Sequence, residues 1–230
     1  MNPTLAIGLL WHVEPDSQPR FLSSCFMLRW GHFFVAPSHC VGTLEPAQIR
    51  ISSVTLLMTE PEEIIHHGVA DICVLRLPRL DFEPGDPFWG ITDDYEPGKG
   101  FHALGWPEDC LAGISAAMGL PFPEGDPPWV KVRLVAGTYQ RFIPQYASPH
   151  GFAFVAGELS IPCPLGLSGG PLFRPETPPL VTGMVIGNLQ TRSVPDSPAQ
   201  VMKDRVIEYG VALMLDQVEG WLDEHIPRRD

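Results

Sequence analysis

The stretch Gly166-Leu167-Ser168-Gly169-Gly170-Pro171-Leu172 sets one serine among three glycines and a proline. A serine hydroxyl becomes a useful nucleophile when a base takes its proton and when backbone N–H donors face the oxygen that turns negative during acyl transfer. Glycine lets the backbone turn sharply enough to bring two such donors close to a substrate. The same residues also fit a plain turn between two strands, so the nucleophile interpretation requires a base and an acid elsewhere in the chain.

The composition favours a chain of short strands. The 230 residues include 22 glycines and 26 prolines, and 44% of the residues are hydrophobic. Frequent glycine and proline interrupt regular structure and favour many short strands and turns over long helices, while the apolar content suffices for a sizeable core. The length suits one large domain or two units of about 100 residues each.

Charge and cysteine usage exclude several classes of function. The formal net charge is −12, which disfavours non-specific binding to nucleic acid or to an anionic membrane. Residues 1–11 lack a basic leader and a cleavage site, and no apolar run approaches the about 20 residues of a membrane span. The five cysteines include no Cys-x-x-Cys pair, and His66-His67 has no third ligand at suitable spacing, so a solvated pair is favoured over a metal site. We expect a cytoplasmic protein with reduced thiols, no metal or cofactor, and no nucleic-acid or membrane partner.

Two upstream segments supply a candidate base and a candidate acid. The apolar segment 33–36 leads into a bend of small residues that carries His39. Asp71 opens the nearly continuous apolar segment 72–77, where a charge is costly unless it is paired or hydrogen-bonded. Each has a plainer alternative, since His39 also fits a satisfied core histidine and Asp71 also fits a surface cap at the start of a strand.

The chain thus carries three local motifs in the order histidine, aspartate, serine. They are Ala36-Pro37-Ser38-His39-Cys40, Ala70-Asp71-Ile72-Cys73-Val74-Leu75-Arg76-Leu77 and the glycine-rich stretch around Ser168. They resemble the motifs Thr-Ala-Ala-His-Cys, Asp-Ile-Ala-Leu-Leu-x-Leu and Gly-Asp-Ser-Gly-Gly-Pro-Leu of the trypsin-like (chymotrypsin-fold) serine proteases, in the same order. Gly183-Met184-Val185-Ile186-Gly187 is similar to the strand that edges the substrate cleft in that family, and Tyr209–Leu213 followed by a helix is similar to its C-terminal end. The resemblance covers nearly the whole chain and is to the bacterial-type, cytoplasmic members.

The resemblance implies an all-β fold of two six-stranded antiparallel Greek-key β-barrels (chymotrypsin/trypsin-like) with a short C-terminal helix. The domains expected from it are an N-terminal barrel at 1–90, a linker at 91–100, a C-terminal barrel at 101–214 and a helix at 215–230. The helix also follows from the apolar spacing near the C-terminus, and the linker from a stretch rich in proline, glycine and acidic residues. Within the second barrel we expect separate strands at 129–136 and 139–146.

The resemblance also implies the roles of individual residues. Ser168 is the expected nucleophile, His39 the base that takes its proton, and Asp71 the group that fixes the tautomer of His39 and stabilises its imidazolium. The backbone N–H groups of Gly166 and Ser168 are the expected oxyanion hole. The expected substrate-binding residues are Pro162, Leu165, Val185, Ile186 and Gly187.

Leu167 and Pro162 depart from the pattern of the secreted members, and three cysteines near the motifs also bear on the expected chemistry. Leu167 replaces the aspartate that pairs with a new N-terminus after zymogen cleavage, so we do not expect activation by such a cut. Pro162 stands six residues before the serine, at the floor of the specificity pocket, which favours an apolar or small residue before the scissile bond over lysine or arginine. Cys25 and Cys40 occupy positions that often form a disulfide, and here we expect free thiols. Cys163 lies too far before the glycine turn to replace Ser168 as nucleophile.

The expected function is that of a serine endopeptidase acting through an acyl-enzyme on a protein or peptide substrate. An effector protease released by a regulatory protein partner is a further expectation, resting on family-level analogy. Two alternatives stay open: a latent or inactive trypsin-like fold that serves as a protein-binding module, and an esterase or acyltransferase with the same triad. The cleft-edge strand at 184–188 favours an extended peptide, which pairs with such an edge by strand addition.

Overall fold

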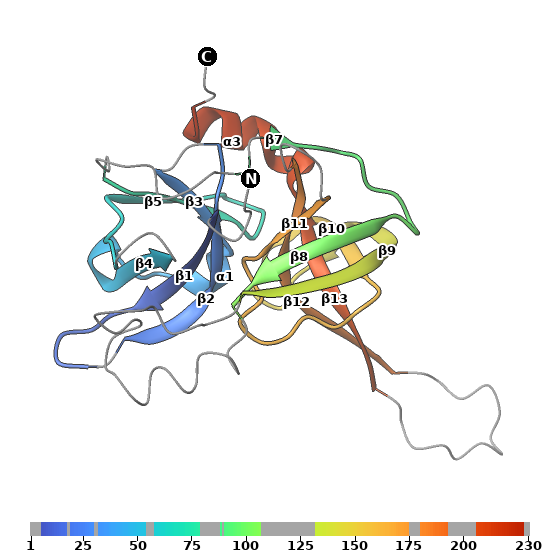
Figure 1. The fold of residues 1–230 in the computed structure, drawn as a ribbon, viewed down its shortest axis with the longest axis horizontal. Coiled ribbons are helices and arrows are strands. Elements are labelled where there is room, and N and C mark those ends of the chain that lie inside the picture. The colour runs from blue at the N-terminus through green and yellow to red at the C-terminus, as the bar shows by residue number, and fades with distance from the viewer. Residues whose placement is uncertain are drawn as a thin grey trace.

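The computed structural model describes residues 6–17, 19–29, 32–53, 58–78, 88, 90–106, 132–174, 180–192 and 206–227. Two β-sheets lie side by side, the first drawn in blue to teal and the second in green to red, and a short helix near the C-terminus lies at one end of both (Figure 1). The described part of the chain therefore has the two-unit, mostly β architecture that the sequence predicts.

The first sheet has six strands in the order β4-β1-β2-β3-β6-β5, and neighbouring strands are antiparallel. Its strands are β1 (Ile7–His12), β2 (Arg20–Met27), β3 (Phe33–Ala36), β4 (Ile49–Ser53), β5 (Glu63–His66) and β6 (Cys73–Arg76). A single helical turn, α1 (Ser38–Val41), follows β3, and a 3-10 turn, η2 (Pro46–Gln48), precedes β4.

The second sheet closes on itself. Its order is β11-β8-β9-β10-β13-β12-β7, and an additional pairing of β11 with β12 joins the six strands β8 to β13 into a ring. The strands are β7 (Gly90–Ile91), β8 (Gly100–Gly105), β9 (Arg133–Ala147), β10 (Ala153–Leu159), β11 (Pro171–Arg174), β12 (Leu180–Arg192) and β13 (Val206–Met214). These elements confirm the expected double β-barrel fold with a short C-terminal helix.

Two details of the second sheet differ from the prediction. It has a seventh strand, β7, whose two residues pair in parallel with β12. Gly90 precedes the predicted linker, and Ile91 is its first residue. The sequence predicts two strands at 129–136 and 139–146, but residues 133–147 form one continuous strand, and residues 129–131 lie outside the described residues. Gly137 in its middle makes no turn; it lies opposite Phe101, and a Cβ there would stand 2.8 Å from the Phe101 ring. This glycine allows close packing rather than a break. The domain boundaries stay a prediction.

The C-terminal segment joins the two units. It consists of a 3-10 turn, η3 (Leu215–Val218), and the helix α3 (Glu219–His225). Leu222 and Ile226 are fully buried in the same cluster as the core of the first sheet. Arg29, two residues after the end of β2, forms ion pairs with Glu219 and Asp223 of α3. The helix that follows the second barrel therefore packs against the first.

Candidate active site

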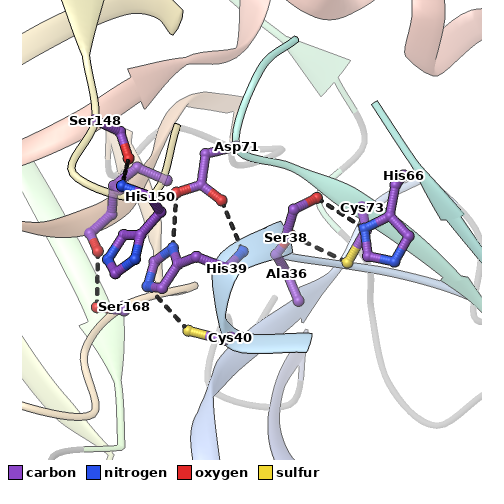
Figure 2. Close-up of polar contacts among 11 residues, drawn as sticks. Ala36, Ser38, His39, Cys40, His66, Asp71, Cys73, Ser148, His150 and Ser168 are labelled. Atoms are coloured by element: carbon purple, nitrogen blue, oxygen red, sulfur yellow. Dashed lines mark hydrogen bonds and ion pairs between the residues drawn. The ribbon is translucent and has the colours of Figure 1, made fainter. Parts of the chain in front are cut away.

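The pairing of β3 with β6 brings His39 and Asp71 together. The two strands are antiparallel with Ala36 opposite Cys73, so the end of β3 meets the start of β6. His39 follows β3 on α1, and Asp71 precedes β6 by two residues. The Nδ1 atom of His39 lies 2.7 Å from Oδ2 of Asp71, and the backbone N–H of His39 donates to Oδ1 at 2.9 Å (Figure 2).

The Asp71 carboxylate is completely buried. A buried charge is costly unless it is paired and hydrogen-bonded, and the two donations from His39 supply both conditions. Burial by itself lowers the pKa of His39, but the hydrogen bonds to Asp71 and to the Cys40 thiol outweigh it, so the pKa of His39 is raised above its ordinary value. This pair therefore favours the imidazolium form of His39.

The turn around Ser168 leaves two backbone N–H groups without an acceptor among the described residues. Gly166 and Gly169 have φ angles of 87° and 84°, which residues with a side chain rarely adopt. The Gly170 N–H donates to the Leu167 carbonyl at 2.8 Å and tightens the turn. In the part of the chain that the structure describes, the N–H groups of Gly166 and Ser168 donate to no acceptor. Both are thus available to an incoming oxygen.

Ser24 on β2 ties this turn to the first sheet. The Gly166 carbonyl accepts from the Ser24 N–H at 3.2 Å and from the Ser24 hydroxyl at 2.8 Å. A Cβ on Gly169 would stand 1.8 Å from the Ser24 carbonyl oxygen, so only glycine fits there. The glycines therefore serve the contact between the barrels as well as the turn, and that contact holds Ser168 on the side of His39.

Ser168 and His39 each have another partner in this structure. The Ser168 hydroxyl donates to the Ile186 carbonyl at 3.0 Å, and His39 Nε2 lies 3.2 Å from the Cys40 sulfur (Figure 2). Between these two described residues there is no hydrogen bond. Catalytic hydrogen bonds are often long or misaligned in free enzymes and form only with substrate.

His150 lies against the candidate base and has no counterpart in the sequence prediction. Its ring stacks on that of His39 with 4.3 Å between centroids and 4° between planes. The residue is exposed in the turn between β9 and β10, and its N–H donates to the Ser148 hydroxyl at 3.0 Å. A single histidine in a loop, without a motif around it, offers no signal from which its position could have been inferred.

The five residues predicted to bind substrate fall into different environments. Ile186 presents its carbonyl to Ser168, and a Cβ on Gly187 would meet no atom within 4 Å, so this part of β12 borders open space. Leu165 is 78% exposed beside Gly166, and Pro162 is also exposed. Val185 is fully buried, and only its backbone reaches the turn, through hydrogen bonds of 2.8 Å with Gly169 and Gly170.

Leu167 is fully buried in the core of the second barrel. A Cβ on Gly105 would lie 2.6 Å from its Cδ1 atom, which shows how closely β8 packs on it. An apolar contact therefore occupies the position where the secreted members carry an aspartate.

The four cysteines with described positions, Cys25, Cys40, Cys73 and Cys163, are free thiols. Burial raises the pKa of Cys163 to about 12, so its sulfur stays protonated and is a poor nucleophile.

Among the residues with described positions, no three His, Cys, Asp or Glu side chains gather closely enough to hold a metal ion, and no helix is both long and apolar enough to cross a bilayer.

Comparison with known proteins gives matches in structure only. No family model and no curated protein matches the sequence. The protease domain of MamO from Magnetospirillum magneticum superposes with a TM-score of 0.63 at 12% identity, covering 96% of this chain and 97% of that one. Rv3671c of M. tuberculosis, in an inactive form with serine replaced by alanine, gives 0.62 at 14% identity, covering 99% and 91%. The inactive form of the Rv3671c protease gives 0.61 at 14% identity, covering 96% and 89%. This chain has the two-barrel, chymotrypsin-like fold of the trypsin-like serine proteases.

Proposed function

We propose that this protein is a serine endopeptidase that hydrolyses peptide bonds of protein substrates through an acyl-enzyme intermediate. The observation that carries the proposal is the combination of a buried, doubly hydrogen-bonded Asp71–His39 pair with a nucleophile turn whose Gly166 and Ser168 N–H groups have no acceptor among the described residues. Acyl transfer by serine needs a base, a group that orients the base, and donors for the oxyanion.

The groups of the site act in a defined sequence in the proposed reaction. His39 Nε2 takes the proton of Ser168 as the serine oxygen attacks the carbonyl carbon, and His39 later returns that proton to the leaving amine. The Asp71 carboxylate holds Nδ1–H and stabilises the imidazolium that forms between these steps. The N–H groups of Gly166 and Ser168 receive the oxyanion, and each such donor typically contributes about 3–4 kcal/mol to the transition state. Water then attacks the acyl-enzyme by the same steps.

Two side chains must rotate before this sequence begins. The Ser168 hydroxyl leaves the Ile186 carbonyl, and the Cys40 thiol leaves His39 Nε2. Each movement breaks one hydrogen bond, with a net cost of about 1 kcal/mol. Substrate docking along β12, next to the open space at Gly187, supplies contacts that offset this cost. The regulatory partner, the effector role and the cytoplasmic location stay predictions.

A fluorophosphonate probe tests the proposal directly. The native protein is expected to become phosphonylated on one residue, Ser168, as located by mass mapping of the digested protein, because only an activated serine attacks such a probe. Heat-denatured protein is the control and is expected to take up no probe. A native protein that stays unlabelled, or that carries the label on another residue, contradicts the proposal.

The pH profile tests the raised pKa of His39. Only neutral His39 accepts the serine proton, so kcat/KM is expected to rise with pH through a limb above the ordinary histidine pKa and to be low at acid pH. Cys40→Ala removes one hydrogen bond that favours the imidazolium. The limb is therefore expected to move towards acid by about 0.7 unit, the equivalent of one hydrogen bond of about 1 kcal/mol. Cys73→Ala, which removes a buried thiol bonded to the Ala36 carbonyl, is the matched control and leaves the limb in place. If Cys40→Ala leaves the pH at which kcat/KM rises unchanged, the contact between the Cys40 sulfur and His39 Nε2 is absent in solution.

A further inference from the structure

We propose that Asn188 and Cys163 close the pocket for the side chain that precedes the scissile bond, so that the protein cleaves after glycine or alanine. The inference rests on the proposed protease function and narrows its substrate class. The sequence predicts only an apolar or small residue at this position, and it singles out neither Asn188 nor a pocket-filling role for Cys163.

The oxyanion donors and β12 locate this pocket. A substrate carbonyl that reaches Ser168 and the N–H groups of Gly166 and Ser168 lies at the turn, and its chain runs beside the open space at Gly187. Ile186 of β12 bonds to Ser168, and Asn188, two residues further along β12, bonds to Cys163. We therefore infer that the side chain of the residue carrying this carbonyl is directed towards the space between the segment 161–165 and β12. The contents of that space decide which side chains enter it.

Asn188 spans this space with its side-chain amide. Its Oδ1 atom accepts from the backbone N–H of Cys163 at 2.7 Å, and its Nδ2 atom donates to the Cys163 carbonyl at 2.9 Å. The Asn188 amide thus bonds to both the backbone N–H and the backbone carbonyl of Cys163, as the backbone of a neighbouring β-strand would. The side chain is thereby held in one orientation, with its other face exposed at the surface.

The space behind Asn188 holds the Cys163 thiol. Gly210 on β13 lies directly opposite Asn188, and its N–H donates to the Ile161 carbonyl at 2.8 Å. A Cβ on Gly210 would stand 2.5 Å from the Cys163 sulfur and 2.8 Å from the Ile161 carbonyl oxygen. The segment 161–163 therefore lies against β13 without a gap at this point. Cys163 itself is only 5% exposed and belongs to the core of the second barrel.

A large side chain would have to break both bonds of Asn188 and displace a buried thiol. Glycine and alanine need neither movement, because their bulk ends at or before Cβ. A difference of one methylene in a fitted pocket changes kcat/KM by about 10- to 200-fold. Selection by the closed pocket is therefore expected to exceed 100-fold between alanine and leucine.

Peptidyl phosphonate diesters that differ only in the residue next to phosphorus test this inference on the full chain. These probes phosphonylate the serine, so the labelling rate reports the pocket even if turnover is slow. The wild type is expected to react with the glycine and alanine probes at least about 100-fold faster than with the leucine and phenylalanine probes. Asn188→Gly and Asn188→Ala are expected to raise the leucine-to-alanine ratio of rates at least tenfold. Gln190→Gly on the same strand, an exposed amide bonded to Glu208, is the matched control and leaves the ratio unchanged.

The small fluorophosphonate probe separates the two ways of failing. If it labels Ser168 while the leucine probe reacts as fast as the alanine probe, the closed pocket is wrong and the protease function stands. If fluorophosphonate labels Ser168 but neither Asn188 variant changes the leucine-to-alanine ratio of labelling rates, the proposed role of Asn188 is wrong. If neither kind of probe labels the native protein, the proposed function fails and this inference fails with it.

Discussion

The Ser168→Ala variant is expected to lose about 10⁶-fold in kcat, the largest functional effect of any single substitution in this chain. The variant keeps the His39–Asp71 pair and the oxyanion donors, but it has no oxygen to attack the carbonyl and forms no acyl-enzyme. The residual rate then comes from substrate binding and the oxyanion donors alone. Steady-state kinetics on an alanine-containing peptide ester, with active-site titration of the wild type, measures the loss.

The fold of this variant is expected to be unchanged, which makes the result interpretable. Ser168 is partly buried, and among the described residues its side chain forms one hydrogen bond, to the Ile186 carbonyl. Loss of that bond lowers the free energy of unfolding by about 1 kcal/mol. Thermal unfolding followed by circular dichroism is the control. A variant that folds and retains activity within tenfold of the wild type would show that Ser168 is not the nucleophile.

The Gly169→Ala variant is expected to show the largest loss of stability, more than about 4 kcal/mol in the free energy of unfolding. The new methyl group would stand 1.8 Å from the Ser24 carbonyl oxygen, which is backbone and has no rotamer to change. The φ angle of 84° at this position adds backbone strain for any residue with a Cβ. Urea unfolding monitored by tryptophan fluorescence measures the change, and the contact between the barrels is expected to be lost first.

Gly187→Ala is the matched control for that experiment. Its Cβ would meet no atom within 4 Å, and its φ lies outside the left-handed region, so the free energy of unfolding is expected to change by less than about 1 kcal/mol. If Gly169→Ala and Gly187→Ala have the same free energy of unfolding, the turn around Ser168 does not pack on β2 in solution. The pair of variants therefore tests the contact that holds Ser168 beside the first barrel.

The residues of the candidate site could be proposed from the sequence because each motif has its own local requirement. Positive φ angles at Gly166 and Gly169 favour glycine, and a charge at Asp71 ahead of an apolar strand needs a partner. Such requirements act over a few residues and are therefore visible in one sequence. The prediction of a double barrel rested on the order of these motifs, and the structure confirms it.

The sequence missed what depends on packing between distant segments. The sequence predicts two strands, which end at 136 and begin again at 139, but Gly137 lies in the middle of one strand. It is a glycine because the Phe101 ring on the neighbouring strand leaves no room for a side chain. The two residues of β7, where the predicted linker begins, form a strand because they pair with residues 180 and 181 of β12. Neither fact is encoded in the residues near it.

The sequence by itself predicted the groups of the candidate site: a base at His39, an acid at Asp71, a nucleophile at Ser168 and the glycines around it. Only the tertiary structure decided what surrounds them. The Cys40 thiol at Nε2 of His39 and the bonds of Asn188 to Cys163 depend on side-chain orientation. The stacking of His150 on His39 depends in addition on the packing of the two sheets. His39 and His150 are 111 residues apart in the sequence and lie next to strands of different sheets. A contact over that separation forms only once both barrels have closed and packed, so the physical reason it escapes the sequence is that no local preference specifies it.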